Sequence, residues 1–134
     1  MAKILEVLAR KVWDSRGRPT VEAEVAVKGS GRTAQSAVGR AIAPAGASMG
    51  SGEAKSVDVR QAVRAVNTEI RNVLVGRELN QKENDKTLVD LDGTPDKSRL
   101  GGNAIVAVSL ACAHAAAAAA KQPLWRHLAG KRAV

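Results

Sequence analysis

Residues able to carry chemistry are few in this sequence, and they lie far apart. The stretch from Gly46 to Ser56 is rich in glycine, yet no Gly-Lys-Ser or Gly-Lys-Thr follows at the spacing of a phosphate-binding P-loop. The two histidines, His114 and His127, are thirteen positions apart with no cysteine or carboxylate cluster beside them, which disfavours a zinc site. No serine, histidine and acid form a plausible hydrolase triad. The residues alone therefore assign no catalytic group.

The single cysteine, Cys112, excludes an internal disulfide and suits a reducing compartment. It lies within an apolar run, where a small buried packing residue is expected rather than a reactive thiol. The N-terminus reaches an acidic residue at Glu6, too soon for the apolar core of a secretory signal. We therefore expect a cytoplasmic protein.

The formal net charge is +8, from 21 basic and 13 acidic residues. Such an excess raises the question of nucleic acid, but the basic residues are scattered and their densest groups are pairs such as Arg10-Lys11. Two tryptophans are the only aromatic residues, a poor platform for stacking bases. We expect no nucleic-acid partner. The basic charge is better explained by a solvated face or by a surface matched to an acidic partner.

Strands are expected first along the chain. Residues 20–28 alternate apolar and polar side chains, which predicts a half-buried strand with one apolar side: Val21, Ala23, Val25 and Val27. Residues 3–13 and 33–43 are expected to form two further strands. The turn Gly29-Ser30-Gly31 would join the strand at 20–28 to the strand at 33–43. Short links between consecutive strands favour an antiparallel meander.

Helices are expected afterwards. Apolar residues at helical spacing run from Val59 to Leu74, with Ser56 as the expected cap and Gly76 as the stop. A short polar helix is predicted at about 80–89, and a long helix at about 103–121, before Pro123. The apolar run within the long helix is too short, and too rich in alanine, for a bilayer span, so no membrane association is expected. Its alanines predict burial on more than one side with close approach of neighbouring elements.

The order of elements gives the fold class. Strands followed by helices predict an α+β domain: a three-stranded antiparallel meander, then a bundle of three to four helices on one face of the sheet. A chain of 134 residues is long enough for one domain and too short for two ordinary ones, so we expect a single domain over residues 1–134.

Three collinear motifs resemble enolase. Residues 14–22 read D-S-R-G-R-P-T-V-E, similar to the opening signature D-S-R-G-x-P-T-V-E. Residues 43–50 read A-P-A-G-A-S-M-G and resemble A-P-S-G-A-S-T-G. Residues 90–111 carry D-L-D-G-T and then K-S-R-L-G-G-N-A-I-V-A-V-S-L-A, similar to D-L-D-G-T…K-S-x-x-G-A-N-A-I-L-A-V-S-L-A. The ending 123–128 also fits. By this ordered set the chain is identified as resembling the N-terminal domain of the enolase family.

The resemblance implies a reaction, but it places the catalytic groups of that reaction in another domain. Enolases pair such a domain with a barrel and convert 2-phosphoglycerate to phosphoenolpyruvate with two Mg²⁺ ions. The base, the acid and the carboxylates of the first metal lie in the barrel, and a barrel needs about 250 residues. The resemblance therefore assigns no catalytic residue to this chain, and we expect the isolated chain not to be catalytic.

One active-site element remains, by the same resemblance. Gly46, Ala47 and Ser48 correspond to a lid that closes over substrate, and Ser48 to a ligand of the second Mg²⁺ when a barrel is present. Tight Mg²⁺ binding by the isolated chain is not expected, because Mg²⁺ needs several oxygen ligands and one residue cannot supply them.

The implied partners are an enolase-type barrel domain and a second copy of the protein. Arg10 and Glu22 match positions that form salt bridges between the subunits of enolase dimers. Arg16, within the opening signature, is expected to serve the contact between domains. In a chain without the partner, we expect Arg10 and Glu22 to be solvated charges of little energetic value.

The sequence departs from the family pattern around the lid. The segment between Ala54 and the following helix is markedly shorter than in the family, and Ala45 and Met49 replace a serine and a threonine. These changes fit a divergent paralogue better than a standard glycolytic enzyme. Two alternatives therefore stay open: an enolase-like enzyme of secondary metabolism acting on a phosphono-carboxylate, and a stand-alone protein-interaction module.

Overall fold

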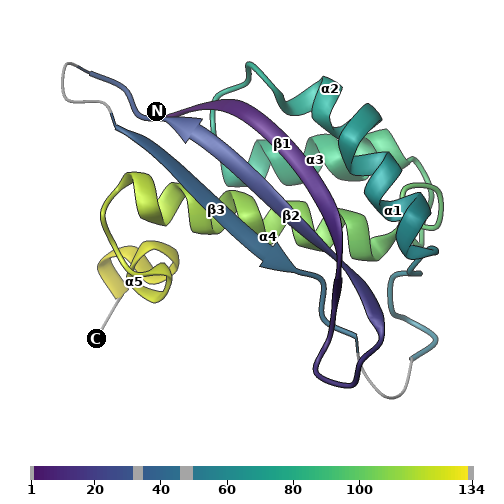
Figure 1. The fold of residues 1–134 in the computed structure, drawn as a ribbon. Coiled ribbons are helices and arrows are strands. Elements are labelled where there is room, and N and C mark those ends of the chain that lie inside the picture. Colours follow the sequence, from purple (N-terminus) through teal and green to yellow (C-terminus); the bar gives the residue numbers. More distant parts are fainter. Residues whose placement is uncertain (1, 32–34, 46–49, 133–134) are drawn as a thin grey trace.

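The computed structural model describes residues 2–31, 35–45 and 50–132. Three strands come first: β1 (Lys3–Trp13), β2 (Pro19–Lys28) and β3 (Ser36–Ile42). Helices follow: α1 (Val59–Ala65), the π-helical segment η1 (Val66–Ile70), α2 (Arg71–Leu74), α3 (Gln81–Asp92), α4 (Gly102–Ala119), α5 (Leu124–Ala129) and the 3₁₀ turn η2 (Gly130–Arg132). This order confirms the α+β class (Figure 1).

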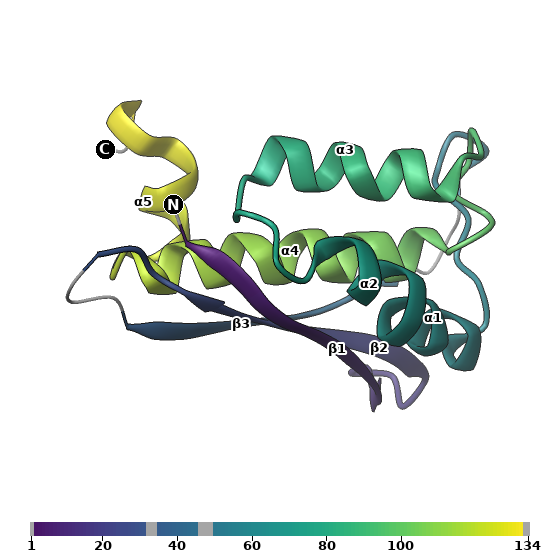
Figure 2. The ribbon, with the colours of Figure 1, turned by 90° about the horizontal axis from the view of Figure 1, so that it is seen from above.

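The sheet is an antiparallel meander in the order β1-β2-β3. Val25 of β2 lies opposite Val7 of β1 and Gly39 of β3. The predicted apolar side of β2 is buried throughout, because alternate residues of a strand point to the same face. Figure 2 shows the helices gathered on one side of the sheet, as expected.

Helix α4 is the centre of the helical layer and lies along β2 and β3, with α3 packed against its other side (Figure 2). Most of its alanines are buried, which confirms the predicted burial on more than one side. At Gly39 of β3, an added Cβ atom would lie only 2.2 Å from the backbone oxygen of Ala111. By length and composition α4 could cross a membrane, but 56% of it is buried inside this fold, which marks it as a core helix.

The helical run from Val59 to Leu74 differs from the sequence expectation in two ways. Asp58, not Ser56, caps its start, because the Asp58 carboxylate accepts a hydrogen bond of 2.9 Å from the Arg60 amide. The run also widens into η1 at its centre. The Asn67 side chain accepts a hydrogen bond from the Ala9 amide at 2.8 Å and donates one to the Ala9 carbonyl at 3.2 Å. It thereby satisfies both backbone polar groups of Ala9 on the outer edge of β1.

A buried carboxylate organises the turn between α3 and α4. Asp92 is 2% exposed and accepts hydrogen bonds from the amides of Thr94 at 2.9 Å and Leu100 at 2.8 Å. Burial alone would raise the pKa of Asp92, but hydrogen bonds from the Thr94 hydroxyl and the two amides lower it below the ordinary value. The turn is therefore held by a carboxylate that stays ionised at neutral pH.

Candidate functional site

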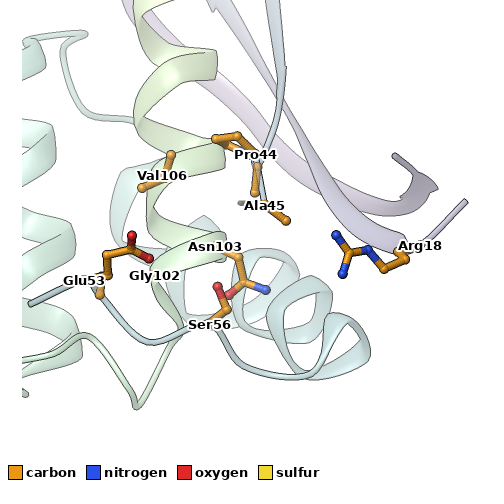
Figure 3. A pocket seen from close by; sticks show the side chains of 10 residues that line it. Arg18, Pro44, Ala45, Glu53, Ser56, Gly102, Asn103 and Val106 are labelled. Atoms are coloured by element: carbon orange, nitrogen blue, oxygen red, sulfur yellow. The ribbon is translucent and has the colours of Figure 1, made fainter. Parts of the chain in front are cut away.

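The enolase-like motifs meet at one end of the molecule. The turn between β1 and β2, the chain after β3, and the N-terminus of α4 surround a hollow there (Figure 3). We call this region the loop end and build it from its two sides. Segments far apart in sequence form it, so its geometry comes from tertiary contacts.

The signature turn is held by its first residue. The Asp14 carboxylate accepts hydrogen bonds of 2.9 Å from the amides of both Arg16 and Arg18. The hydrogen bond from the Arg18 amide lowers the pKa of Asp14 most, and the bond from the Arg16 amide lowers it further. Gly17 has φ +72°, a conformation that favours glycine. The Asp-Ser-Arg-Gly motif thus makes a rigid turn that presents two arginines beside the chain leaving β3.

That chain is fastened to the signature turn just before the expected lid. Arg16 Nη2 donates to the carbonyl of Ala45 at 2.6 Å, and the Thr20 hydroxyl donates to the carbonyl of Ala43 at 2.9 Å. Thr20, the second residue of β2, is buried. Arg16 therefore has a role within this chain: it holds the entry to the lid. The contact between domains implied for Arg16 stays a prediction.

The exit from the lid is fastened to α4. Gly102 donates its amide to the Lys55 carbonyl at 2.7 Å, and Lys55 donates to the Asp96 carbonyl at 2.7 Å. The Asn103 side chain accepts from the Val57 amide at 3.2 Å and donates to the Val57 carbonyl at 3.0 Å. A Cβ atom at position 102 would lie 2.8 Å from the Cβ of Ala54. The shortened segment after Ala54 thus packs tightly on the start of α4.

Between entry and exit lies a hollow of about 330 Å³. Its polar side chains are Arg18, Glu53, Ser56 and Asn103, and Figure 3 shows them arranged around it with Pro44, Ala45 and Val106. Glu53 is the one carboxylate among the described residues that line it. One carboxylate opposite an arginine can orient an anionic group, but it supplies neither a general acid–base pair nor a metal cage.

The predicted lid residues Gly46, Ala47 and Ser48 lie outside the described part of the chain. Within residues 2–31, 35–45 and 50–132, no three histidine, cysteine, aspartate or glutamate side chains are grouped to hold a metal ion. The described residues therefore do not fit a Mg²⁺ site by themselves. Ligands for such an ion would have to come from outside this set.

The predicted interface residues Arg10 and Glu22 lie on the sheet face that carries no helix. They are direct partners in the β1–β2 register and form an ion pair with each other. Glu24 joins them, 3.4 Å from Arg10 Nη2 and 3.1 Å from Arg40 Nε. The hydrogen bond to Glu22 raises the pKa of Arg10. Instead of being free charges, the two residues are paired within the chain, and their use between subunits stays a prediction.

The remaining sequence candidates lie apart from this site. Cys112 is fully buried in α4, and burial raises the pKa of its thiol to about 12. That confirms a packing role rather than a reactive one. Sequence reasoning gave no role to Thr20 or Asn103, although both belong to recognised motifs. Their partners lie 23 and 46 residues away, and no local pattern indicates such contacts.

Comparison with known families agrees with this geometry. The model of the family described as "Enolase, N-terminal domain" matches residues 4–128. The match contains the signature turn, the lid segment, the Asp92 turn and the whole of α4. Because it covers nearly the entire chain, this protein belongs to the enolase N-terminal domain family.

Proposed function

We propose that this chain is the lid-bearing domain of an enolase-type, Mg²⁺-dependent carbon–oxygen lyase that acts in the cytoplasm on 2-phosphoglycerate. The observation that carries the proposal is the double fastening of the segment around the lid. Arg16 and Thr20 fix its entry, and Gly102 and Asn103 fix its exit, beside a hollow that holds Arg18 and Glu53. Fixed entry and exit segments are what a lid that closes over substrate needs.

The chemistry requires a second domain. Removal of a proton beside a carboxylate needs a positioned base and strong stabilisation of the developing negative charge. Among the described residues that line the hollow, Glu53 is the one carboxylate and Arg18 the one cation. We propose that a barrel domain supplies the base, the acid and the metal carboxylates, and that Ser48 adds oxygen ligands for the second Mg²⁺. The isolated chain then has no dehydratase activity.

The test is the formation of phosphoenolpyruvate, followed by its ultraviolet absorbance. The purified chain is assayed alone, and then fused through its C-terminus to an enolase barrel domain whose own lid domain has been removed. We expect no turnover from the chain alone and Mg²⁺-dependent turnover from the fusion, above that of the barrel. Metal-dependent turnover by the chain alone would overturn the division of roles, and a fusion no better than the barrel would overturn the proposal itself.

A matched pair of serine variants locates the metal ligand. In the active fusion, Ser48→Ala is expected to lower kcat by at least about tenfold, since an interaction with the reacting complex is lost. Ser51→Ala, three residues away, should leave it unchanged. Equal effects would argue against a specific role for Ser48. The same fusion assayed with a phosphono-carboxylate separates the glycolytic reaction from the alternative in secondary metabolism.

A further inference from the structure

The outer edge of β3 has no strand beside it. β3 pairs with β2 alone, and Figure 1 shows it as the outermost strand of the sheet, with α4 behind it. One residue beyond the last register pair, the Ala43 amide donates to the Val21 carbonyl at 2.9 Å. In an antiparallel ladder such hydrogen-bonded pairs alternate with pairs whose backbone groups point outward. The amides and carbonyls of Val38, Arg40 and Ile42 therefore point away from β2, and we call them the open edge.

The two edges of the sheet are treated differently. On the outer edge of β1, Asn67 pairs with the backbone of Ala9, and the Ile4 amide donates to the Arg77 carbonyl at 2.9 Å. Within the part of the chain that the structure describes, the open edge of β3 has no hydrogen-bond partner. Edge strands are commonly protected by proline or lysine, and β3 contains neither. Its row of free donors and acceptors is a template for another strand.

Apolar side chains flank the open edge on both of its sides. Val38 and Ile42, which alternate with the helix-facing Gly39, are 48% and 45% exposed on the helix-free face. On the helical side, Val106 and Leu110 of α4 lie one turn apart and are 38% and 39% exposed. Val106 lines the loop-end hollow together with the chain that leaves β3, so this flank of α4 lies on the side of the open edge. A strand added to β3 would cover apolar surface on both faces.

Arg40 gives the open edge a preference for negative charge. Its side chain is 63% exposed and contacts Glu24 through Nε, at 3.1 Å. No described residue accepts a hydrogen bond from its Nη atoms. A carboxylate directly opposite Arg40 on an added strand would meet these donors, because opposed residues of an antiparallel pair share a face. β3 has no acidic residue, so a second copy paired through the same edge would offer none.

We propose that the open edge binds an extended segment of another protein as an added antiparallel strand, with an acidic residue opposite Arg40 and apolar residues opposite Val38 and Ile42. The edge itself determines the kind of partner, because an extended chain presents donors and acceptors at the spacing of alternate strand residues. Backbone hydrogen bonds then supply the binding, and the side chains supply the preference. This inference does not rest on the proposed enzymatic function, because it concerns the edge of β3 and not the lid.

The probe is the labelled peptide Lys-Thr-Val-Val-Glu-Val-Val-Thr-Lys, followed by fluorescence anisotropy as the full chain is added. Its sequence reads the same in both directions and places a Val on either side of Glu on each face. Two matched versions carry N-methyl groups on a pair of Val residues. Methylation of the pair that shares a face with Glu removes amides that would meet β3, and we expect it to weaken binding at least about tenfold. Methylation of the pair next to Glu removes amides that would point away, and binding should persist.

Variants of the chain test the same edge. Val38→Pro removes an amide that points away from β2, so the β2–β3 ladder is kept, whereas Val38→Thr keeps that amide. We expect Val38→Pro to weaken binding at least about tenfold and Val38→Thr to change it little. Leu110→Gln on α4 should also weaken binding, whereas Val89→Gln on α3, which is similarly exposed at 41%, should not. Circular dichroism melts establish that each variant is folded.

Three results would overturn the proposal: no peptide binding, equal binding of the two methylated peptides, or native affinity in Val38→Pro. If Val38→Pro fails to fold, the methylated pair decides alone. A dimer in sedimentation that Val38→Pro dissociates, without any binding of the peptide, would assign the edge to a second copy and overturn the proposal as well. A peptide with Gln in place of Glu that binds as tightly as the original would refute the part given to Arg40.

Discussion

Replacing Gly39 by alanine tests the closest contact in the core. Gly39 lies in β3 directly against α4, and an added Cβ atom would be 2.2 Å from both the Ala111 oxygen and the Ala115 nitrogen. Ordinary contacts of this kind begin at 3.4 Å, so β3 and α4 would have to separate by about 1.2 Å, the difference between these distances. Overpacking a core costs about 1–3 kcal/mol, and we expect the upper end of this range because both obstructing atoms are backbone.

The assay is urea unfolding followed by circular dichroism. Gly39→Ala should lower the free energy of unfolding by about 3 kcal/mol, a large part of the 5–15 kcal/mol typical of a domain, with an unchanged slope against urea. Gly52→Ala is the control, because nothing lies within 4 Å of an added Cβ atom at that position. A loss below about 1 kcal/mol for Gly39→Ala would refute the close contact between β3 and α4.

Three further predictions concern the buried side chains of Asp92 and Cys112 and the hydrogen bonds of Asn67 to β1. Because folding lowers the pKa of Asp92, the ionised carboxylate stabilises the fold above its unfolded pKa of about 3.9, and this contribution is lost as the pH falls through the folded pKa. The native chain should therefore be more stable than Asp92→Asn at neutral pH, and the difference in the free energy of unfolding should shrink on acidification. A difference independent of pH would contradict this. Cys112, with a pKa of about 12, should react with a thiol reagent at neutral pH only when urea unfolds the chain; rapid labelling of the native protein would show that α4 opens locally. Asn67→Ala should cost about 1–2 kcal/mol in urea unfolding because both polar groups of Ala9 lose a partner, whereas Asn72→Ala on the exposed side of α2 should cost less. Equal losses would contradict the role of Asn67.

The sheet could be predicted from the sequence because its signal is local. Strict alternation along β2 identifies both the strand and its buried side, and short connections leave a meander as the simplest arrangement. The long apolar run that became α4 is equally clear. Helix starts are less well determined: Ser56 and Asp58 both have capping side chains, and the choice of Asp58 depends on where the preceding segment is fastened to Asn103.

The candidate site, like the fold, could be predicted from the sequence only in part. The motif residues around the lid could be found by resemblance, and they do lie at one end of the fold. The contacts that give them roles could not, because Arg16 meets Ala45 and Asn103 meets Val57 across 29 and 46 residues of sequence. Arg10 and Glu22 illustrate the opposite case. The resemblance predicts that they form salt bridges with another subunit. In the structure they are neighbours in the β1–β2 register and form an ion pair with each other.

The sequence by itself determined the three strands, the three longest helical segments and the family. Each of these depends on periodicity, on motif order or on which residue types are present. Only the tertiary structure decided that Gly39 brings β3 against α4 and that the chain on both sides of the lid is fastened. These features arise where distant segments meet, and the distances between such segments are fixed by packing rather than by local preference.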